Sequence, residues 1–253
     1  MMTVNTKPVD IVIPIYKASF DVEEKFAIDQ SFAVLSAYPI VFVAPHGLDI
    51  SFYTTAYPSA TFIYFEERYF KSVNDYSRLL VSDEFYAAFE SEFLLIVQPD
   101  VYLFHDDLPY WINSPFDYVG APWPNGLSLN IKFGKFDLGG VGTPITVYVG
   151  NGGLSLRRRK KCMALIAEHR EIADWFIRSG SNEDLFFAFM GALSADFVIP
   201  NQITASLFAL EVSPERFYTI NGEKLPMGVH RYCDYSSEFW KARIPSPGLL
   251  QQA

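Results

Sequence analysis

The stretch that decides the fold is VDIVIPIY, residues 9–16, a largely β-branched apolar run that the polar Lys17 ends. Such a run without alternating polar positions is typical of a strand buried on both faces of a parallel sheet. Apolar residues at helical spacing follow over 21–35, and a second apolar run at 40–44 stops at Pro45. The order strand, helix, strand predicts a parallel βαβ unit.

The same alternation continues outward along the chain. Strand-like runs occupy 61–65 and 93–97, with helical turns between them over 73–89. Strands that alternate with helices predict an α/β fold with a mostly parallel central sheet flanked by helices. After residue 110 the texture changes, because prolines and glycines punctuate 115–144, which indicates a loop-rich C-terminal half.

Regular patterns return later in the chain. The spacing predicts helices over 158–179 and 185–190, and short strands with turns from 197 onward. No linker or internal repeat divides the 253 residues, so we expect a single domain, 1–253.

Composition narrows the classes of function. Half of the residues are hydrophobic and the formal net charge is −9, which favours a folded globule and makes nucleic acid an unlikely partner. Cys162 and Cys233 lack metal-ligand spacing, and no export signal is visible. The densest apolar run, 93–97, is far shorter than the ~20 residues that span a bilayer. We therefore expect a cytoplasmic protein, peripheral to a membrane at most.

The run 93–97 is followed by Gln98, Pro99 and Asp100. Because ligands of open α/β sheets bind beyond the carboxyl ends of the strands, Asp100 is well placed to meet a metal ion or a ribose. The alternative is that Asp100 only ends the strand in a turn. Gln98 offers a neutral oxygen, which is a weaker cation ligand than a carboxylate.

Two further segments carry candidate residues. Glycines in the sequence GNGG, 150–153, let a ligand or another backbone approach closely, or form a bulge or tight turn. Glu183 and Asp184 open the later helix, where a carboxylate stays ionised and can take a proton from a hydroxyl. Asp184 is the first candidate base and Glu183 the second, although acids at this position also serve as simple caps.

The late segment LPMGVHR, 225–231, adds a histidine and an arginine. His230 could give a neutral imidazole to a metal ion, and Arg231 could neutralise a diphosphate. The alternative for a lone histidine is a purely structural role.

Taken in order, these segments resemble one family, that of domain of unknown function 5672, which is itself similar to GT-A glycosyltransferases. The similarity runs from about 9 to about 230. Its segments are KSVNDYSRLL at 71–80, the strand ending in Gln98 and Asp100, DYVGAPW at 117–123, VGNGGLSLR at 149–157, the acids at 183–184 and LPMGVH at 225–230.

The resemblance implies a GT-A-like, Rossmann-like domain with a nucleotide-binding half at about 9–110 and an acceptor and catalytic half at about 111–235. It implies transfer of a hexose from a nucleotide-diphosphate sugar to a glycan or lipid-linked glycan, in surface polysaccharide synthesis. Inversion at the anomeric carbon is the expected outcome, and retention stays open.

Roles for individual residues follow from the same resemblance. Asp100 and His230 would bind Mn²⁺ or Mg²⁺, with Gln98 standing where the Asp-x-Asp of GT-A glycosyltransferases has its first acid. Trp123 would stack on a sugar ring, unless it only fills space beneath a loop. The implied nucleotide-binding residues are Pro14, Tyr16, Lys71, Asn74, Arg78, Gln98 and Asp100, and the implied substrate-binding residues are Trp123, Asn151, Gly152, Gly153 and Arg231.

Two other classes of function remain possible on the sequence. A carbohydrate-binding module would need aromatic loops but no base, and a glycoside hydrolase would need two carboxylates about 5 to 9.5 Å apart.

The basic cluster RRRKK, 157–161, has two interpretations. It could hold the protein against an anionic membrane at its inner face, or could simply be a solvated helix start.

Overall fold

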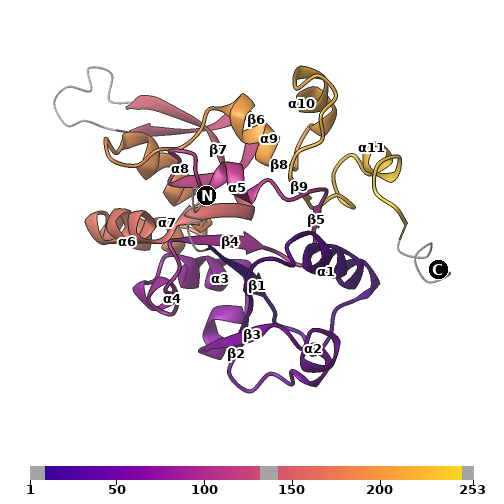
Figure 1. The fold of residues 1–253 in the computed structure, drawn as a ribbon. Helices are drawn as coiled ribbons and strands as arrows, with labels where there is room; N and C mark the ends of the chain where they lie inside the picture. The colour runs from indigo at the N-terminus through magenta and orange to yellow at the C-terminus, as the bar shows by residue number, and fades with distance from the viewer. Residues whose placement is uncertain (1–8, 132–141, 247–253) are drawn as a thin grey trace, which may run out of the picture.

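The computed structural model describes residues 9–131 and 142–246, and a six-stranded sheet lies at its centre (Figure 1). The strand order is β3 (Thr61–Phe65), β2 (Ile40–Pro45), β1 (Val9–Pro14), β4 (Phe93–Val97), β7 (Thr143–Arg158), β6 (Tyr118–Ile131). The first four strands are parallel, and β7 and β6 run antiparallel to their neighbours. The mostly parallel α/β sheet is therefore confirmed.

Helices cover both faces of the sheet, because the strand side chains alternate between two apolar cores. Val12 packs into one core and Ile11 and Ile13 into the other. The first core is covered by α3 (Val73–Leu80), α4 (Asp83–Ala87), α6 (Arg159–Glu168), α7 (Arg170–Arg178) and α8 (Glu183–Leu193). The second is covered by α1 (Val22–Val34), α2 (Ser51–Ala56), α5 (Leu108–Trp111) and α9 (Gln202–Phe208).

Local capping explains where the helices begin. Asp21 accepts a hydrogen bond from the backbone N–H of Glu24 and completes a capping box, so α1 starts where the pattern predicts. The predicted turns over 73–89 form two helices, because Ser82 caps α4 with its hydroxyl. The single helix predicted over 158–179 is likewise two helices, with His169 at the junction.

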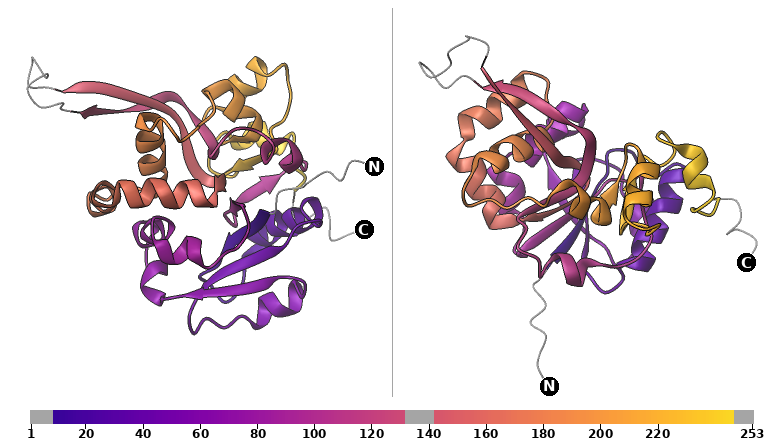
Figure 2. Two further views of the ribbon diagram at one scale, coloured as in Figure 1. Left: turned by 60° about the vertical axis from the view of Figure 1, so that its left-hand side comes forward. Right: turned by 90° about the horizontal axis from the view of Figure 1, so that it is seen from above.

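The expectation of a loop-rich stretch over 115–144 is wrong for 118–131 and 143–144, which belong to strands, whereas 132–141 lie outside the described residues. Strands β6 and β7 form a long hairpin there, which extends away from the rest of the fold in Figures 1 and 2. Pro122 is compatible with β6 because this strand is the edge of the sheet and its pairing is irregular on both sides of that proline. Proline and glycine therefore mark an irregular edge strand here, not a loop.

The part of the chain from 197 onward is also more helical than predicted. It contributes α9, α10 (Pro214–Ile220) and α11 (Ser237–Lys241) together with two short strands. Those strands, β8 (Ala209–Leu210) and β9 (Gly228–His230), form a second sheet with β5 (Val101–Leu103) in the order β5-β9-β8. Since β5 follows β4 after a short turn, this small sheet brings residue 230 to the carboxyl end of β4.

A short 3₁₀ helix, η1 (Glu67–Phe70), completes the described elements between β3 and α3. None of the helices within 9–131 and 142–246 combines the length and the hydrophobicity that a membrane span requires.

Candidate active site

Two adjoining cavities lie beyond the carboxyl ends of β1 and β4. We call the first the charged pocket; its volume is about 460 Å³. We call the second the β1 pocket; its volume is about 450 Å³. The charged pocket is lined by Val73, Tyr76, Ser77, Gln98, Asp100, Asn151, Gly152, Gly153, Asn182, Glu183, Asp184, Glu211, His230, Arg231 and Asp234. The β1 pocket is lined by Pro14, Tyr16, Glu24, Phe70, Lys71, Ser72, Val73, Tyr76, Gln98, Pro99 and Asp100.

In the charged pocket, His230 lies between two carboxylates. Its Nδ1 donates a hydrogen bond to Glu211 Oε2 over 2.8 Å, and its Nε2 lies 3.2 Å from Asp100 Oδ1. His230 and Glu211 are buried, whereas the Asp100 side chain is 47% exposed. Burial alone would lower the pKa of His230, but the two carboxylates outweigh it and raise that pKa to about 9.

The pKa of Asp100 is shifted in the opposite direction, below its ordinary value. Burial tends to raise its pKa, but the neighbouring His230 and Arg231 favour the carboxylate and leave the pKa below its ordinary value. Asp100 is therefore an ionised, accessible carboxylate at the end of β4.

These residues fit a divalent cation. The contact of His230 Nε2 with Asp100 is an ion pair without hydrogen-bond alignment, so Nε2 is a buried nitrogen with no hydrogen-bond partner among the described residues. An unpartnered imidazole nitrogen beside a carboxylate is a donor set that Mn²⁺ accepts. No group of three or more His, Cys, Asp or Glu side chains suited to a metal occurs within 9–131 and 142–246, so water or substrate oxygens would have to complete the coordination.

The glycines of 150–153 make room for charged side chains. A Cβ on Gly153 would lie 2.3 Å from the His230 ring, and one on Gly152 would lie 3.0 Å from Glu183 Oε1. Asn151 and both glycines line the charged pocket. Their small size is required first of all by the packing of His230 and Glu183.

Glu183 belongs to a buried ion pair. Its Oε1 accepts a hydrogen bond from Arg157 Nη2 over 2.8 Å, and its Oε2 accepts one from the Ser77 hydroxyl over 2.7 Å. Arg157 is completely buried and also lies over the rings of Tyr118 and Phe187, at 5.3 Å from each centroid. Both Glu183 oxygens thus have partners, which leaves Glu183 poorly suited to act as a base.

Asp184 is the free member of the acidic pair. Its side chain lines the charged pocket, and among the described residues its hydrogen-bond donor is the backbone N–H of Leu185, over 2.7 Å. Burial, with the nearby Glu183 carboxylate as a second cause, raises the pKa of Asp184 to about 7. A carboxyl group with a pKa near neutrality can take up and release a proton under physiological conditions.

The structure brings together most of the expected nucleotide-binding residues. Pro14, Tyr16, Lys71, Gln98 and Asp100 line the β1 pocket.

Two expected nucleotide-binding residues lie elsewhere. The Asn74 amide donates to the backbone oxygens of Ile177 and Ser181 and so ties α3 to the end of α7. Arg78 is exposed and lines neither pocket. The sequence could not separate these residues because helical spacing alone does not tell which turn of α3 faces the sheet edge.

Of the expected substrate-binding residues, Trp123 alone does not line the charged pocket. Arg231 lines the charged pocket, with a left-handed backbone at φ 53° and its guanidinium paired with Asp234 at 2.7 Å. Trp123 instead packs on Gly150, where a Cβ would lie 2.5 Å from the indole, and it contacts the first core. The space-filling interpretation of Trp123 therefore accounts for its position.

The basic cluster 157–161 does not form one exposed patch. Arg157 is buried against Glu183, and Arg158 Nε lies 2.9 Å from Asp117 Oδ1. The remaining three members open α6, and a membrane contact through them stays a prediction.

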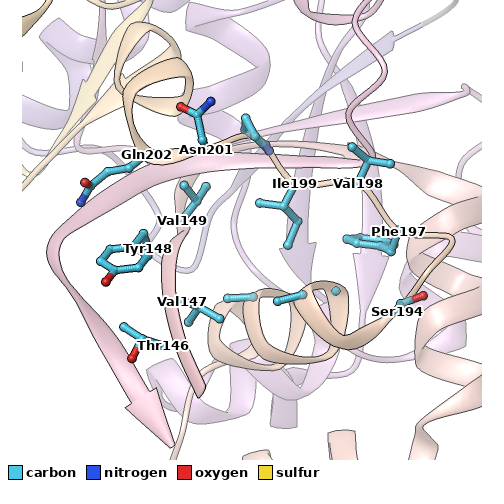
Figure 3. Close-up of a pocket in the computed structure, with 14 residues that line it drawn as sticks. Thr146, Val147, Tyr148, Val149, Ser194, Phe197, Val198, Ile199, Asn201 and Gln202 are labelled. Carbon is cyan, nitrogen blue, oxygen red and sulfur yellow. The ribbon is translucent and has the colours of Figure 1, made fainter. Parts of the chain in front are cut away.

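A third hollow, the uncharged groove, lies between β7, α8 and the segment 194–202 (Figure 3). Its volume is about 570 Å³, and none of its 14 lining residues is charged. In Figure 3, Val147 and Ile199 point toward α8. Along β7 the groove ends at Val149, two residues before Asn151 enters the charged pocket.

Two functional candidates were missed from the sequence, Glu211 and Arg157. Glu211 follows a two-residue strand that the pattern does not reveal. Arg157 reads as part of a solvated basic run, and only its place at an inward position of β7 distinguishes it from its neighbours.

Comparisons with known structures show the fold. The glycosyltransferase GlyE of Streptococcus pneumoniae TIGR4 in its apo form aligns with a TM-score of 0.52 and 12% identity, over 98% of this chain and 62% of that chain. The galactosyltransferase LgtC, in complex with donor and acceptor sugar analogues, aligns with a TM-score of 0.50 and 16% identity, over 90% and 87%. An active-site mutant of LgtC aligns with a TM-score of 0.51 and 14% identity, over 96% and 94%. The chain thus spans about three fifths of GlyE and most of LgtC.

Sequence comparison gives the family. A search of curated proteins found no significant match. The profile of the family described as "Protein of unknown function (DUF5672)" matches residues 59–230, which is more than half of the chain. With the structural likeness to GlyE and LgtC, this match establishes that the chain belongs to the DUF5672 family and has the fold of GT-A glycosyltransferases.

Proposed function

We propose that the protein is a glycosyltransferase that takes a hexose from a nucleotide-diphosphate sugar and transfers it to a glycan or lipid-linked glycan. One observation carries the proposal: Asp100, His230 and Asp184 line a single pocket beyond the carboxyl end of β4. This is the edge at which open α/β sheets bind their ligands. The family resemblance adds surface polysaccharide synthesis as the setting.

The donor nucleotide is assigned to the β1 pocket. Pro14 ends β1 there, Tyr16 follows it, and Lys71 offers a cation to a phosphate. Because Asp100 lines both pockets, a diphosphate between them would lie beside it. This arrangement supports a nucleotide-binding half at about 9–110 and a catalytic half at about 111–235.

Asp100 and His230 would hold Mn²⁺ or Mg²⁺, whose positive charge stabilises the negative charge that develops on a diphosphate leaving group. The His230 imidazole must lose its Nε2 proton to act as a ligand. Glu211 keeps the other ring nitrogen occupied, and Gly153 leaves space for the ring.

Asp184 is assigned as the base. An acceptor hydroxyl attacks the anomeric carbon, the bond from that carbon to the diphosphate oxygen breaks, and the hydroxyl proton passes to Asp184. Displacement of this kind inverts the anomeric carbon. A pKa of about 7 leaves roughly half of the Asp184 side chains ionised at neutral pH.

The acceptor is assigned to the uncharged groove. Ala188 lines the groove one turn of α8 after Asp184, so an acceptor lying there could extend a hydroxyl to the base. The absence of charge from the lining suits a neutral glycan or the neutral end of a lipid-linked one.

Thermal unfolding with a panel of nucleotide diphosphates and sugar nucleotides, each with and without Mn²⁺, tests the proposal. A ligand at one hundred times its dissociation constant adds about 2.7 kcal/mol, which should raise the midpoint by several degrees. A metal-dependent shift with one nucleotide, followed by release of its sugar to water or acceptor, supports the transferase.

Other outcomes point to the other classes. No shift with any nucleotide, together with binding of oligosaccharides, would indicate a carbohydrate-binding module. Cleavage of an oligosaccharide without any nucleotide would indicate a glycoside hydrolase.

A further inference from the structure

Glu211 and His230 are neighbours because of strand register. Strands β8 and β9 are parallel, and Leu210 pairs with Val229. The next residue after this pair is Glu211, just past the end of β8, on one side and His230, the last residue of β9, on the other. Both side chains are buried, at 5% and 7% exposure, and Glu211 Oε2 lies 2.8 Å from His230 Nδ1.

The imidazole of His230 is confined on its remaining sides. Its ring lies over Gly153, where a Cβ would come within 2.3 Å of ring atoms. Strand β9 pairs antiparallel with β5, and His230 pairs with Val101, so the ring also lies beside Asp100. With Nδ1 bound by Glu211, only Nε2 is directed toward Asp100 and the charged pocket.

We propose that Glu211 is a positioning residue, which fixes the ring of His230 so that Nε2 faces Asp100. This inference rests on the proposed function, because Nε2 is the nitrogen assigned to a divalent cation. Histidines that bind metals commonly donate their second N–H to a carboxylate, which fixes ring orientation, and loss of that partner typically weakens metal affinity 10- to 100-fold. A carboxylate can only accept here, so Nδ1 carries the proton.

A purely structural role for Glu211 makes a different prediction. If Glu211 only satisfied a buried nitrogen, its removal would lower the stability of the fold and leave Mn²⁺ affinity unchanged. The two roles therefore differ in metal affinity and in the state of the His230 ring, which can be measured separately from turnover.

The experiment compares wild type, Glu211→Ala, Glu211→Gln and Asp100→Asn in the full chain. Glu215→Ala is the matched control, because Glu215 is exposed and its carboxylate accepts a hydrogen bond from the Ser236 hydroxyl and not from His230. Mn²⁺ alone is the probe, and its dissociation constant is measured from the electron paramagnetic resonance signal of the free ion. We expect Glu211→Ala to weaken Mn²⁺ binding about 10- to 100-fold.

The conservative variant and the control sharpen this expectation. Glu211→Gln keeps an oxygen that can accept from Nδ1, so we expect it to weaken Mn²⁺ binding less than Glu211→Ala. Glu215→Ala should bind Mn²⁺ as wild type does. In the metal-free protein, nitrogen-15 NMR should show a hydrogen-bonded Nδ1 proton on His230 that Glu211→Ala loses.

Wild-type Mn²⁺ affinity and unchanged His230 resonances in folded Glu211→Ala would overturn the proposal. Should that variant not fold, a metal-free wild type whose His230 shows no hydrogen-bonded Nδ1 proton would overturn it instead. If wild type binds Mn²⁺ no better than Asp100→Asn, the metal role in the proposed function fails. The NMR comparison still decides whether Glu211 orients His230.

Discussion

The charged pocket and the uncharged groove border the same two elements, β7 and α8, yet they differ in chemistry. The groove is the larger of the two, at about 570 Å³ against about 460 Å³. Charged side chains occur only in the lining of the pocket, among them Asp100, Glu183, Asp184 and Glu211. We therefore base the proposed reacting site on buried charge and not on cavity volume.

The reason lies in the free energy of burying a charge. An ionised group inside a protein is tolerated when it is paired and hydrogen-bonded. The Glu183 carboxylate accepts hydrogen bonds from two side chains, and the Glu211 carboxylate accepts one from His230. Among the described residues, the Asp184 carboxylate accepts a hydrogen bond only from a backbone N–H. Asp184, the carboxylate with the fewest hydrogen-bond partners of these three, is the one whose pKa approaches neutrality. It is also the residue that we assign to proton transfer.

The largest effect should come from Asp184→Asn. An amide cannot take the proton of the acceptor hydroxyl, so we expect turnover to fall about 10²- to 10⁴-fold while nucleotide binding persists. Steady-state rates and the nucleotide-induced shift of the unfolding midpoint measure the two quantities. Asp174→Asn on the exposed side of α7 is the matched control and should keep wild-type turnover. Near-normal turnover of Asp184→Asn would remove the base assignment.

Stability should suffer most from Arg157→Met. The variant leaves Glu183 buried beside an apolar side chain, and breaking a buried ion pair costs about 3–5 kcal/mol. Chemical denaturation should show this loss, and adding Glu183→Gln should recover part of it. The exposed Arg178→Met provides the comparison and should change stability little. Equal losses for the two arginine variants would contradict a structural role of the Arg157–Glu183 pair.

The sequence predicts which segments form the charged pocket better than it predicts which side chains pair with one another inside it. The carboxyl end of β4, the glycines at 152–153 and the acids at 183–184 are all local signals, and the structure brings them together. Which of Glu183 and Asp184 is compensated depends on Arg157, which is 26 residues away. Long-range pairing of this kind leaves no periodic trace in a single sequence.

The same limit explains the errors in the fold. The apolar runs alone predict the strands from β1 to β4, because a strand buried on both faces of a parallel sheet is an almost continuous apolar run. The hairpin β6–β7 was missed because edge strands tolerate prolines and bulges, which resemble loop signals. Strands β8 and β9 are two and three residues long, so no pattern could place Glu211 beside His230.

Raising the pH should affect activity and stability in opposite directions through Asp184. As a base, Asp184 must be ionised, so at saturating Mn²⁺, which keeps His230 deprotonated, kcat/KM should rise about tenfold per pH unit below about pH 7 and level off above it. The folded protein binds this proton more tightly than the unfolded chain, whose value is 3.8, so stability falls as pH rises from 3.8 to about 7.

Asp184→Asn separates the Asp184 contribution from that of other groups. The variant cannot ionise at this position, so the fall in stability between pH 4 and about 7 should be smaller than in wild type. Midpoints of urea unfolding across this range measure the difference. Identical pH profiles for wild type and variant would show that another group is responsible.

The smallest effect should come from the groove, through Val198→Asp. Val198 lines the groove and is 41% exposed, so a carboxylate fits there with little harm to the fold. A charge in this surface should repel a neutral or apolar acceptor and raise its KM about tenfold, equivalent to ~1.4 kcal/mol. The nucleotide-induced midpoint shift should not change, because no groove residue lines the β1 pocket. Ile172→Asp, an apolar-to-acid change on exposed α7, is the control. If Val198→Asp altered nucleotide binding and left the acceptor KM unchanged, the two hollows would have to exchange their assigned ligands.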